Sequence, residues 1–351
     1  MKLPPAASPA AVSTAAASPA AAPASLAASL HGLAQLLRAS GYRFHTVTPA
    51  THARVLARGQ RQARDLADAF GWNLPFHTDL LGAARCAELA AAAIIAPCAD
   101  RSDMSDMSDV GSMNGMNGLW RAQLRAASLG DMLLFHSAYP TSSHDAVFFG
   151  PDSYRFIAAL ERSLPTLARP PRRLVDIGCG AGPAALVLAA AFTDAEVIAA
   201  DINQRALALT AANAALAGVT NVRTTFSDLL GGVDGAIDLV VANPPYMLDA
   251  DARAYRHGGG GHGEALAVAI VRAALARLAP GGTLMLYTGA PFVRQHDVLR
   301  DAIAPLLDGA GCHWHYEELD PDVFGEQLEQ PGYEDVERIA AVWLVAHMPT
   351  A

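Results

Sequence analysis

The feature that most constrains the fold is a pattern of apolar strand, glycine-rich turn and helix that repeats from Arg173 onward. Apolar segments predict strands near residues 174–177, 196–200, 222–226, 237–242 and 283–287, and helices near 182–192, 203–217 and 263–278. Alternation of this kind builds a parallel sheet covered by helices on both faces. Two more strands, near 312–318 and 338–347, would close one edge of the sheet. We therefore predict an α/β fold with a doubly wound, mostly parallel, seven-stranded Rossmann-like sheet.

The first half of the chain divides into segments of different composition. Residues 1–25 are rich in Ala, Pro and Ser, which predicts a disordered tail rather than a signal peptide. Residues 26–118 predict a mainly helical recognition domain, in which the repetitive segment 103–118 is a flexible insertion. Its helices are expected near residues 25–40, 51–70 and 80–93. Short apolar runs at 119–150 predict a β-rich connector to a catalytic domain at 151–351.

Bulk composition favours a cytoplasmic protein without a membrane segment. The longer apolar stretches are interrupted by charged residues or are too short to cross a bilayer. The four cysteines form neither a C-x-x-C pair nor a disulfide framework, which suits a reducing compartment. The formal net charge of −9 argues against strong nucleic-acid binding by the whole chain, because neutralised phosphates supply most of that affinity.

Local charge departs from this average in two places. Residues 27–64 hold six arginines and no acid, and Arg54, Arg58 and Arg61 would share one face of the predicted helix at 51–70. That face is either a solvated surface or a docking surface for RNA or an acidic partner. Residues 317–337 hold nine acids and no Lys or Arg, a stretch that would repel phosphates if it lay near a substrate.

A glycine-rich turn follows the first predicted strand of the sheet. Its candidate ligand-binding residues are Asp176, Gly178, Cys179, Gly180 and Gly182. This strand end is where a doubly wound sheet binds ligands, and glycines let the backbone approach a ligand closely. Pro183 stands where a dinucleotide motif would have its third glycine, so NAD and FAD are disfavoured. A Walker motif is also absent, because no Lys-Ser/Thr pair closes the turn.

The next two strand ends also present acidic residues. Asp201, followed by Ile202, lies where a carboxylate can accept hydrogen bonds from both hydroxyls of a ribose. Asp228 can accept from an adenine amino group while Leu229 packs on the ring. Each acid alone is equally consistent with a helix cap or a turn. Together, on consecutive strand ends, they indicate a bound nucleoside.

The most specific motif is Asn243-Pro244-Pro245-Tyr246 at the end of an apolar strand. Two prolines restrict the backbone and cannot donate hydrogen bonds. A target NH₂ group can then donate to the Asn243 side-chain oxygen and the Pro244 carbonyl, while Tyr246 stacks on the planar group that bears it. Alignment and electrostatics of this kind suffice for transfer to a nitrogen lone pair, without a metal or covalent nucleophile.

With these motifs, the stretch from Arg173 to Tyr287 resembles the catalytic core of class I S-adenosylmethionine-dependent methyltransferases. Its Asn-Pro-Pro-Tyr motif is similar to that of HemK-like protein-glutamine N5-methyltransferases and of N6-adenine methyltransferases. The resemblance implies S-adenosyl-L-methionine as cofactor. It places the methionine part at the glycine-rich turn, the ribose at Asp201 and the adenine at Asp228 and Leu229. The segment 147–154 occupies the position at which HemK-like enzymes have a connector that covers the cofactor, but its sequence departs from their Pro-Arg-Pro-x-Thr-Glu motif.

The predicted activity is N-methyl transfer to a planar nitrogen, for which the resemblance favours a protein glutamine amide. A helical N-terminal domain would then recognise a protein partner such as a translation release factor. The alternatives are a nucleic-acid methyltransferase acting on an exocyclic base amine, a small-molecule methyltransferase, and a catalytically silent binding module.

The glycine-rich loop 257–263 follows the Asn-Pro-Pro-Tyr motif and is predicted to be a mobile loop beside the acceptor. It contains His257 and His262, but a run of glycines fixes no ligand geometry. We therefore predict that this pair is not a metal site.

Overall fold

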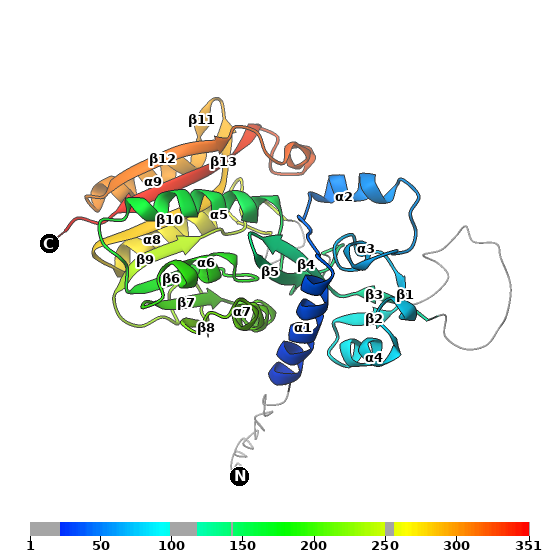
Figure 1. Ribbon diagram of the computed structural model, residues 1–351. Coiled ribbons are helices and arrows are strands. Elements are labelled where there is room, and N and C mark those ends of the chain that lie inside the picture. Colours follow the sequence, from blue (N-terminus) through cyan, green and yellow to red (C-terminus); the bar gives the residue numbers. More distant parts are fainter. Residues whose placement is uncertain (1–21, 99–117, 142, 250–255, 351) are drawn as a thin grey trace, which may run out of the picture.

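The structure of the protein is a computed structural model that describes residues 22–98, 118–141, 143–249 and 256–350 (Figure 1). The first 21 residues of the predicted tail, and the predicted insertion 103–118 apart from its last residue, lie outside the described residues. A central sheet with helices on both faces forms one side of the molecule in Figure 1, and a smaller unit built from the N-terminal residues forms the other.

The central sheet follows the strand order β12-β13-β10-β9-β6-β7-β8, and β11 pairs with β10 outside this path. Its strands are β6 (Arg173–Ile177), β7 (Glu196–Asp201), β8 (Val222–Phe226), β9 (Ile237–Ala242), β10 (Leu278–Val293), β11 (His296–Asp297), β12 (His313–Asp320) and β13 (Val336–His347). The five neighbouring strands β8, β7, β6, β9 and β10 run parallel to one another. Strand β13 is antiparallel to both of its neighbours, β10 and β12. The predicted doubly wound, mostly parallel sheet is confirmed. The two-residue strand β11 is an addition that the apolar pattern did not predict.

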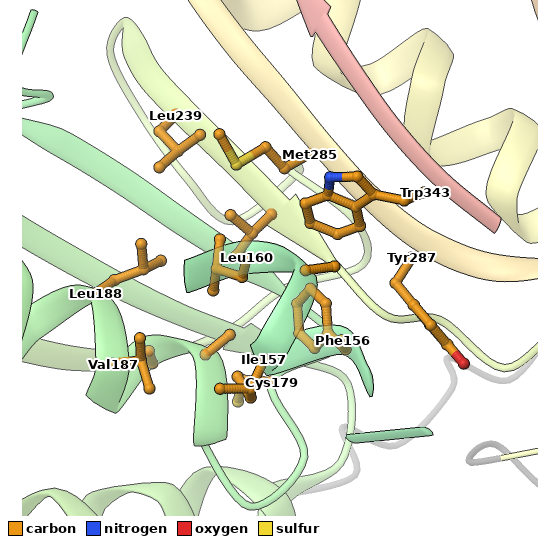
Figure 2. Packing of buried hydrophobic residues seen from close by; sticks show 14 of the residues in the cluster. Phe156, Ile157, Leu160, Cys179, Val187, Leu188, Leu239, Met285, Tyr287 and Trp343 are labelled. Atoms are coloured by element: carbon orange, nitrogen blue, oxygen red, sulfur yellow. The ribbon is translucent and has the colours of Figure 1, made fainter. Parts of the chain in front are cut away.

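Helices cover the two faces of this sheet. One face carries α5 (Pro151–Ser163), the short η3 (Leu164–Thr166), α6 (Pro183–Ala191) and α7 (Gln204–Ala217), and the other carries α8 (Ala265–Arg277) and α9 (Val298–Gly309). Helix α7 begins where the Asn203 side chain accepts the Arg205 N–H and ends at Gly218, which has left-handed geometry. Figure 2 shows Phe156 and Leu160 of α5 packed against Met285 and Trp343 of the sheet. This packing fixes α5 over the strand ends that carry the candidate site.

Within the described residues, the N-terminal unit combines four α-helices with a small three-stranded sheet. It contains α1 (Ala22–Ala39), α2 (Pro49–Leu56), α3 (Leu66–Phe70), β1 (Phe76–His77), η1 (Thr78–Leu80), α4 (Ala83–Ala91), β2 (Ile95–Pro97) and β3 (Leu119–Ala122). These three strands form a small antiparallel sheet in the order β1-β3-β2. A separate hairpin, β4 (Leu124–Leu129) with β5 (Met132–Ser137), follows it. The β-rich connector that we expected is therefore divided, because its first strand completes the N-terminal sheet.

The helix that we predicted at 51–70 is two short helices. Helix α2 ends at Leu56, and Gly59, with a φ of 97°, turns the chain away from helical geometry. Helix α3 starts later because the Asp65 side chain accepts the Asp68 N–H at 2.9 Å. Arg54, Arg58 and Arg61 are exposed, but they do not share the helical face that we predicted. Helix α1, in turn, begins at residue 22, inside the segment that we expected to be tail.

The N-terminal unit is attached to the central sheet through α7. The Asn213 side chain accepts the Phe135 N–H of β5 at 2.9 Å and donates to the Phe135 and Ala181 carbonyls. Arg38 of α1 donates to the Leu216 carbonyl. Asn213 is buried and joins the β4–β5 hairpin to the glycine-rich turn after β6, next to the candidate site. Searched over its described residues, the chain has no helix with the length and apolarity that a membrane span needs.

Candidate active site

The glycine-rich turn after β6 is shaped by left-handed backbone at its glycines. Gly178 has a φ of 69° and Gly182 a φ of 84°, values that side chains disfavour. A Cβ at Gly178 would meet nothing within 4 Å, so this turn leaves open space above the strand end. A Cβ at Gly182 would lie 2.8 Å from Thr210, so here the glycine allows α6 to pack closely on α7. The turn thus combines an open face for a ligand with a tightly packed base.

Asp176 is buried at the base of this turn. Its Oδ2 accepts the Ala185 N–H of α6 at 3.1 Å, and 2% of the residue is exposed. Burial raises the pKa of Asp176 to about 7, and the nearby Asp201 carboxylate adds to the rise, whereas the Ala185 bond opposes it. A carboxyl group with this pKa gains most from a cationic ligand, which would stabilise its charged form.

Asp201, at the end of β7, is held in a fixed orientation. Its Oδ2 accepts the Gly180 N–H at 3.0 Å and its Oδ1 accepts the Asn203 N–H at 2.8 Å. Burial raises the pKa of Asp201, and the backbone hydrogen bonds from Gly180 and Asn203 oppose that rise. An ionised carboxylate offers about four lone-pair sites. Both oxygens of Asp201 therefore keep acceptor capacity for a pair of ligand hydroxyls.

Two exposed apolar side chains stand beside Asp201. Ile202 is 51% exposed and Phe226 is 57% exposed, and they are the large apolar residues with high exposure among those described. Phe226 pairs in register with Asp201 across β7 and β8. Leu229 follows in the next turn, which Ser227 shapes by accepting the Gly232 N–H, and Asp228 is exposed there. Exposed apolar side chains on both neighbouring strand ends suit a flat aromatic ring.

These features fit the adenosyl and methionine parts of S-adenosylmethionine. The open glycine turn, the oriented carboxylate of Asp201 and the apolar residues beside it match the chemistry of that ligand. The sequence pattern does not single out Phe226, although an aromatic residue at the end of a strand, directly before the predicted adenine residues, is an available signal.

Cys179, which we predicted to bind the cofactor, has no polar group exposed to a ligand. Its thiol is buried, burial raises the pKa of that thiol, and the sulfur lies 3.5 Å from the Thr210 hydroxyl. Its N–H donates to the Ala200 carbonyl and its own carbonyl accepts the Gly182 N–H. Cys179 therefore shapes the turn from inside, and the ligand-facing role that we predicted for it is not the one this geometry allows.

The segment before α5 lies over the glycine-rich turn. A Cβ at Gly180 would lie 3.9 Å from the Phe148 carbonyl oxygen. The Asn203 side chain donates to the Asp145 carbonyl at 2.9 Å. These contacts place residues 145–148 across the turn and the start of α7, which is the location expected of a segment that covers a cofactor.

The Asn-Pro-Pro-Tyr motif leaves β9 beside the glycine-rich turn. Strands β6 and β9 are neighbours, with Ile177 paired to Ala242, so Gly178 and Asn243 follow adjacent strand ends. Asn243 and Pro245 are half-buried, and Pro244 is buried. The motif is thus next to the space in which the predicted cofactor would present its methyl group.

Tyr246 is anchored rather than free to stack. Its hydroxyl donates to Oδ2 of Asp152 at 2.6 Å, and its ring lies edge-on to Phe324 with centroids 5.9 Å apart. A Cβ at Gly289 would lie 2.1 Å from the ring, so the ring rests against the backbone of β10. Only 7% of Tyr246 is exposed, which leaves too little of the ring face for the stacking role that we predicted.

Asp152 is a functional candidate that sequence reasoning missed. Besides Tyr246, Oδ1 of this buried carboxylate accepts the Tyr287 hydroxyl at 2.8 Å and the Arg155 guanidinium at 3.1 Å. The partners come from α5, β10 and the end of β9, and no local pattern relates them. Burial and the neighbouring Asp152 carboxylate raise the pKa of Tyr246 far above that of a free phenol, so its hydroxyl stays a donor.

The glycine-rich loop is folded onto the backbone of the motif. Gly258 donates to the Met247 carbonyl at 2.8 Å, and a Cβ at Gly263 would lie 2.2 Å from the Tyr246 carbonyl oxygen. The glycines therefore permit close packing of the loop on the motif, and its mobility stays a prediction. His257 accepts the Asp249 N–H, and His262 lies 3.0 Å from Asp335. Within the described ranges, no group of three His, Cys, Asp or Glu residues is placed to hold a metal ion.

The acidic stretch also reaches this end of the sheet. Besides the contact of Phe324 with Tyr246, the Tyr333 hydroxyl accepts the Leu248 N–H at 2.8 Å. The short η4 helix (Gly325–Glu329) lies between these two contacts in the chain. Residues 320–335 therefore border the Asn-Pro-Pro-Tyr motif, and their acidic side chains contribute negative potential there.

The methyltransferase small domain family model matches residues 157–305. The strand order described above is that of a doubly wound, Rossmann-like α/β sheet. The chain is 40% identical over 124 residues to the release factor glutamine methyltransferase of Deinococcus radiodurans, covering 32% of this chain and 44% of the relative. It is 36% identical over 157 residues to the protein of the same name from Cereibacter sphaeroides, covering 41% of this chain and 54% of the relative. The chain thus spans about half the length of these curated relatives.

Among solved structures, one match is Methanocaldococcus jannaschii Trm5 in complex with adenosine. It is 18% identical, with a TM-score of 0.45, and covers 65% of this chain and 57% of that one. A likeness of this extent adds nothing to the assignment of function.

Proposed function

We propose that the protein is a cytoplasmic methyltransferase that uses S-adenosylmethionine to methylate a protein glutamine side-chain amide. The observation that carries this proposal is the adjacency of two strand ends. The open glycine turn after β6 and the Asn-Pro-Pro-Tyr motif after β9 follow the paired residues Ile177 and Ala242. A cofactor in the turn and an acceptor at the motif would therefore face each other across neighbouring strands.

On the cofactor side, Asp201 would orient the ribose through its two hydroxyls. Ile202 and Phe226 would cover the faces or edges of the adenine, with Asp228 and Leu229 beside it. Asp176 would stabilise positive charge near the methionine part from beneath the turn. When bound, S-adenosylmethionine supplies an electrophilic methyl group on a sulfonium, which is an activated leaving group.

On the acceptor side, the side-chain oxygen of Asn243 and the carbonyl of Pro244 would accept the two N–H bonds of a planar NH₂ group. Holding both hydrogens in this way directs the nitrogen lone pair out of the plane, toward the cofactor. Prolines in succession limit rotation of the backbone that carries the second acceptor. Catalysis then comes from alignment and from stabilising the positive charge that develops on nitrogen.

Two observations support a protein amide as the acceptor. The relatives are release factor glutamine methyltransferases, and residues 320–335 place acidic side chains beside the motif. Negative potential at the entrance disfavours a phosphate backbone and suits a neutral or basic polypeptide segment. A translation release factor is the partner that we propose.

The test is to incubate the purified protein with methyl-tritiated S-adenosylmethionine and an extract of a strain that lacks its gene. Protease and nuclease digestions then locate the label. Label released by protease, and found on N5 of glutamine after hydrolysis-free peptide mapping, is the expected result. Label released by nuclease would replace the protein acceptor with a nucleic-acid base, and label in neither fraction would contradict the proposed macromolecular activity.

A further inference from the structure

Asp152 lies where it can govern the geometry of the Asn-Pro-Pro-Tyr motif from outside it. It stands in the first turn of α5, with 7% of the residue exposed, and its two oxygens accept hydrogen bonds from the hydroxyls of Tyr246, after β9, and Tyr287, within β10. Its negative charge is balanced by Arg155, which also reaches Asp320 at 3.0 Å. A carboxylate this well partnered has a single favourable position, so the hydroxyls bound to it are also fixed.

The ring of Tyr246 occupies a slot that only glycine can form. Adding a Cβ at Gly289 would bring it to 2.1 Å from one ring carbon and 2.5 Å from another. Phe324 closes the slot from the side, and the hydroxyl end is bound by Asp152. Figure 2 shows the hydroxyl of Tyr287 pointing away from the core residues Phe156 and Ile157. This hydroxyl donates to Oδ1 of Asp152. Tyr246 is thus held along its whole length.

We propose that Asp152 is a positioning residue, which acts through the Tyr246 hydroxyl to hold Asn243 and Pro244 at the angle needed for methyl transfer. This role rests on the proposed function of the motif. The two prolines make the segment stiff, so that fixing the Tyr246 ring at one end and β9 at the other determines where both acceptor oxygens point. The Gly258 bond to the Met247 carbonyl holds the residue that follows.

This assignment gives the tyrosine of the motif a different task from stacking on the acceptor. The acceptor would meet the side chain of Asn243 and the Pro244 carbonyl, and would be excluded from the face of Tyr246. Release of the ring from Asp152 would let the motif shift. A displacement of about 1 Å at reacting atoms can lower a rate by about 100-fold.

A matched pair of variants separates positioning from stability, since Tyr246→Phe and Tyr287→Phe each remove one hydroxyl from the same carboxylate. Both variants lose a hydrogen bond to the same charged group, which destabilises the fold in either case. We expect a similar fall in the thermal midpoint for both variants. Tyr246→Phe should lower kcat by about 10- to 100-fold, whereas Tyr287→Phe, which leaves the motif anchored, should lower it less than about threefold.

The measurements are kcat with the labelled protein fraction as acceptor, and the Kd for S-adenosylmethionine by calorimetry. The Kd should stay within about twofold of wild type in both variants, because neither hydroxyl touches the cofactor turn. Asp152→Asn, which keeps the shape of the side chain, should resemble Tyr246→Phe in kcat. Equal kcat values in the two tyrosine variants would overturn the positioning role.

The outcomes also separate this role from the proposed function. If wild type methylates protein and Tyr246→Phe does so at the wild-type rate, the proposed function stands and the role of Asp152 is wrong. If wild type transfers no methyl group to any acceptor, the proposed function fails and the positioning role falls with it. Should Asp152→Asn not fold, the two phenylalanine variants decide the matter alone.

Discussion

The cofactor side and the acceptor side of the proposed site lie on adjacent strand ends but are held by contacts of different range. Asp176 accepts a backbone N–H from 9 positions away in the chain, and Asp201 accepts backbone N–H groups from 21 and 2 positions away. Tyr246, by contrast, is held by Asp152, 94 positions away, and Tyr287 joins the same carboxylate from a distance of 135. The cofactor side is thus built within one strand-turn-helix unit and its neighbour, whereas the acceptor side requires α5, β10 and the acidic C-terminal stretch together.

The largest effects should come from one substitution on each side, compared by kcat and by the Kd for S-adenosylmethionine. Asn243→Ala removes an acceptor of the target N–H and should lower kcat by about 100- to 1,000-fold with an unchanged Kd for S-adenosylmethionine. Asp201→Ala should raise that Kd by about 10-fold or more, with most of kcat regained at saturation. For each variant, titration calorimetry gives the Kd for S-adenosylmethionine and saturation kinetics give kcat. An equal loss of cofactor binding in both would show that the two sides are not separable.

The same difference in range explains what could be predicted from the sequence. The sheet, the glycine-rich turn and the acids after β7 and β8 follow from apolar periodicity and from turn residues, which are local signals. Even within this region the burial of Cys179 was not predicted, because its thiol packs against Thr210 of α7. Phe226 was missed because strand periodicity says nothing of how exposed a strand end is.

On the acceptor side, the motif could be recognised but its supports could not. The bond between Tyr246 and Asp152 depends on α5 crossing the sheet, and a single sequence gives no register between them. Gly289 likewise has no signature in β10, since its importance comes from the ring that lies against it. The predicted helix at 51–70 failed for a local reason, because Gly59 and the capping side chain of Asp65 outweigh the apolar spacing.

Gly289→Ala should disrupt the acceptor side alone. The added methyl group occupies the place of the Tyr246 ring, so we expect a loss of about 1–3 kcal/mol in unfolding free energy from overpacking. The fall in kcat should be about 10-fold or more, with Kd for S-adenosylmethionine unchanged. Gly309→Ala is the matched control, because that glycine ends α9 with open space around it and an ordinary φ. Wild-type kcat in Gly289→Ala would show that the ring need not occupy this slot.

The cofactor side should have its own pH dependence, set by Asp176. Because burial raises its folded-state pKa from 3.8 to about 7, unfolding free energy should fall as pH rises from about 4 to 7, by up to about 1.4 kcal/mol per unit. Binding of a cationic cofactor favours the ionised carboxylate, so its affinity should rise with pH up to about 7, by at most about 10-fold per unit. Calorimetry from pH 5.5 to 8, in buffers of different ionisation enthalpy, measures both the affinity and the proton released.

Asp176→Asn is the control for this titration, since it keeps the side-chain shape and removes the ionisation. Its affinity should be weaker above pH 7 and nearly independent of pH below it. A slope that persists in this variant would assign the titration to another group, of which Asp201 is the nearest.

The smallest effect is expected from replacing the exposed arginines Arg54, Arg58 and Arg61, because they lie farther from the acceptor side than the residues discussed above. They follow Thr46, whose N–H donates to the Tyr154 hydroxyl in the same first turn of α5 that carries Asp152. Replacing Arg54, Arg58 and Arg61 together with Ala should raise KM for the protein acceptor by about three- to tenfold at low salt and little at high salt, because exposed charges act mainly on encounter and are screened.

Neither kcat nor the Kd for S-adenosylmethionine should change in this triple variant, because the three guanidinium groups are exposed and lie outside the site. Arg272→Ala, an exposed arginine of α8 on the opposite face of the sheet, should leave KM unaltered. An unchanged KM in the triple variant would confine acceptor recognition to the strand ends and the acidic stretch beside them. A salt-dependent rise would extend the acceptor side into the N-terminal unit, and would explain why that unit is fastened to α5 and α7 rather than joined by a free linker.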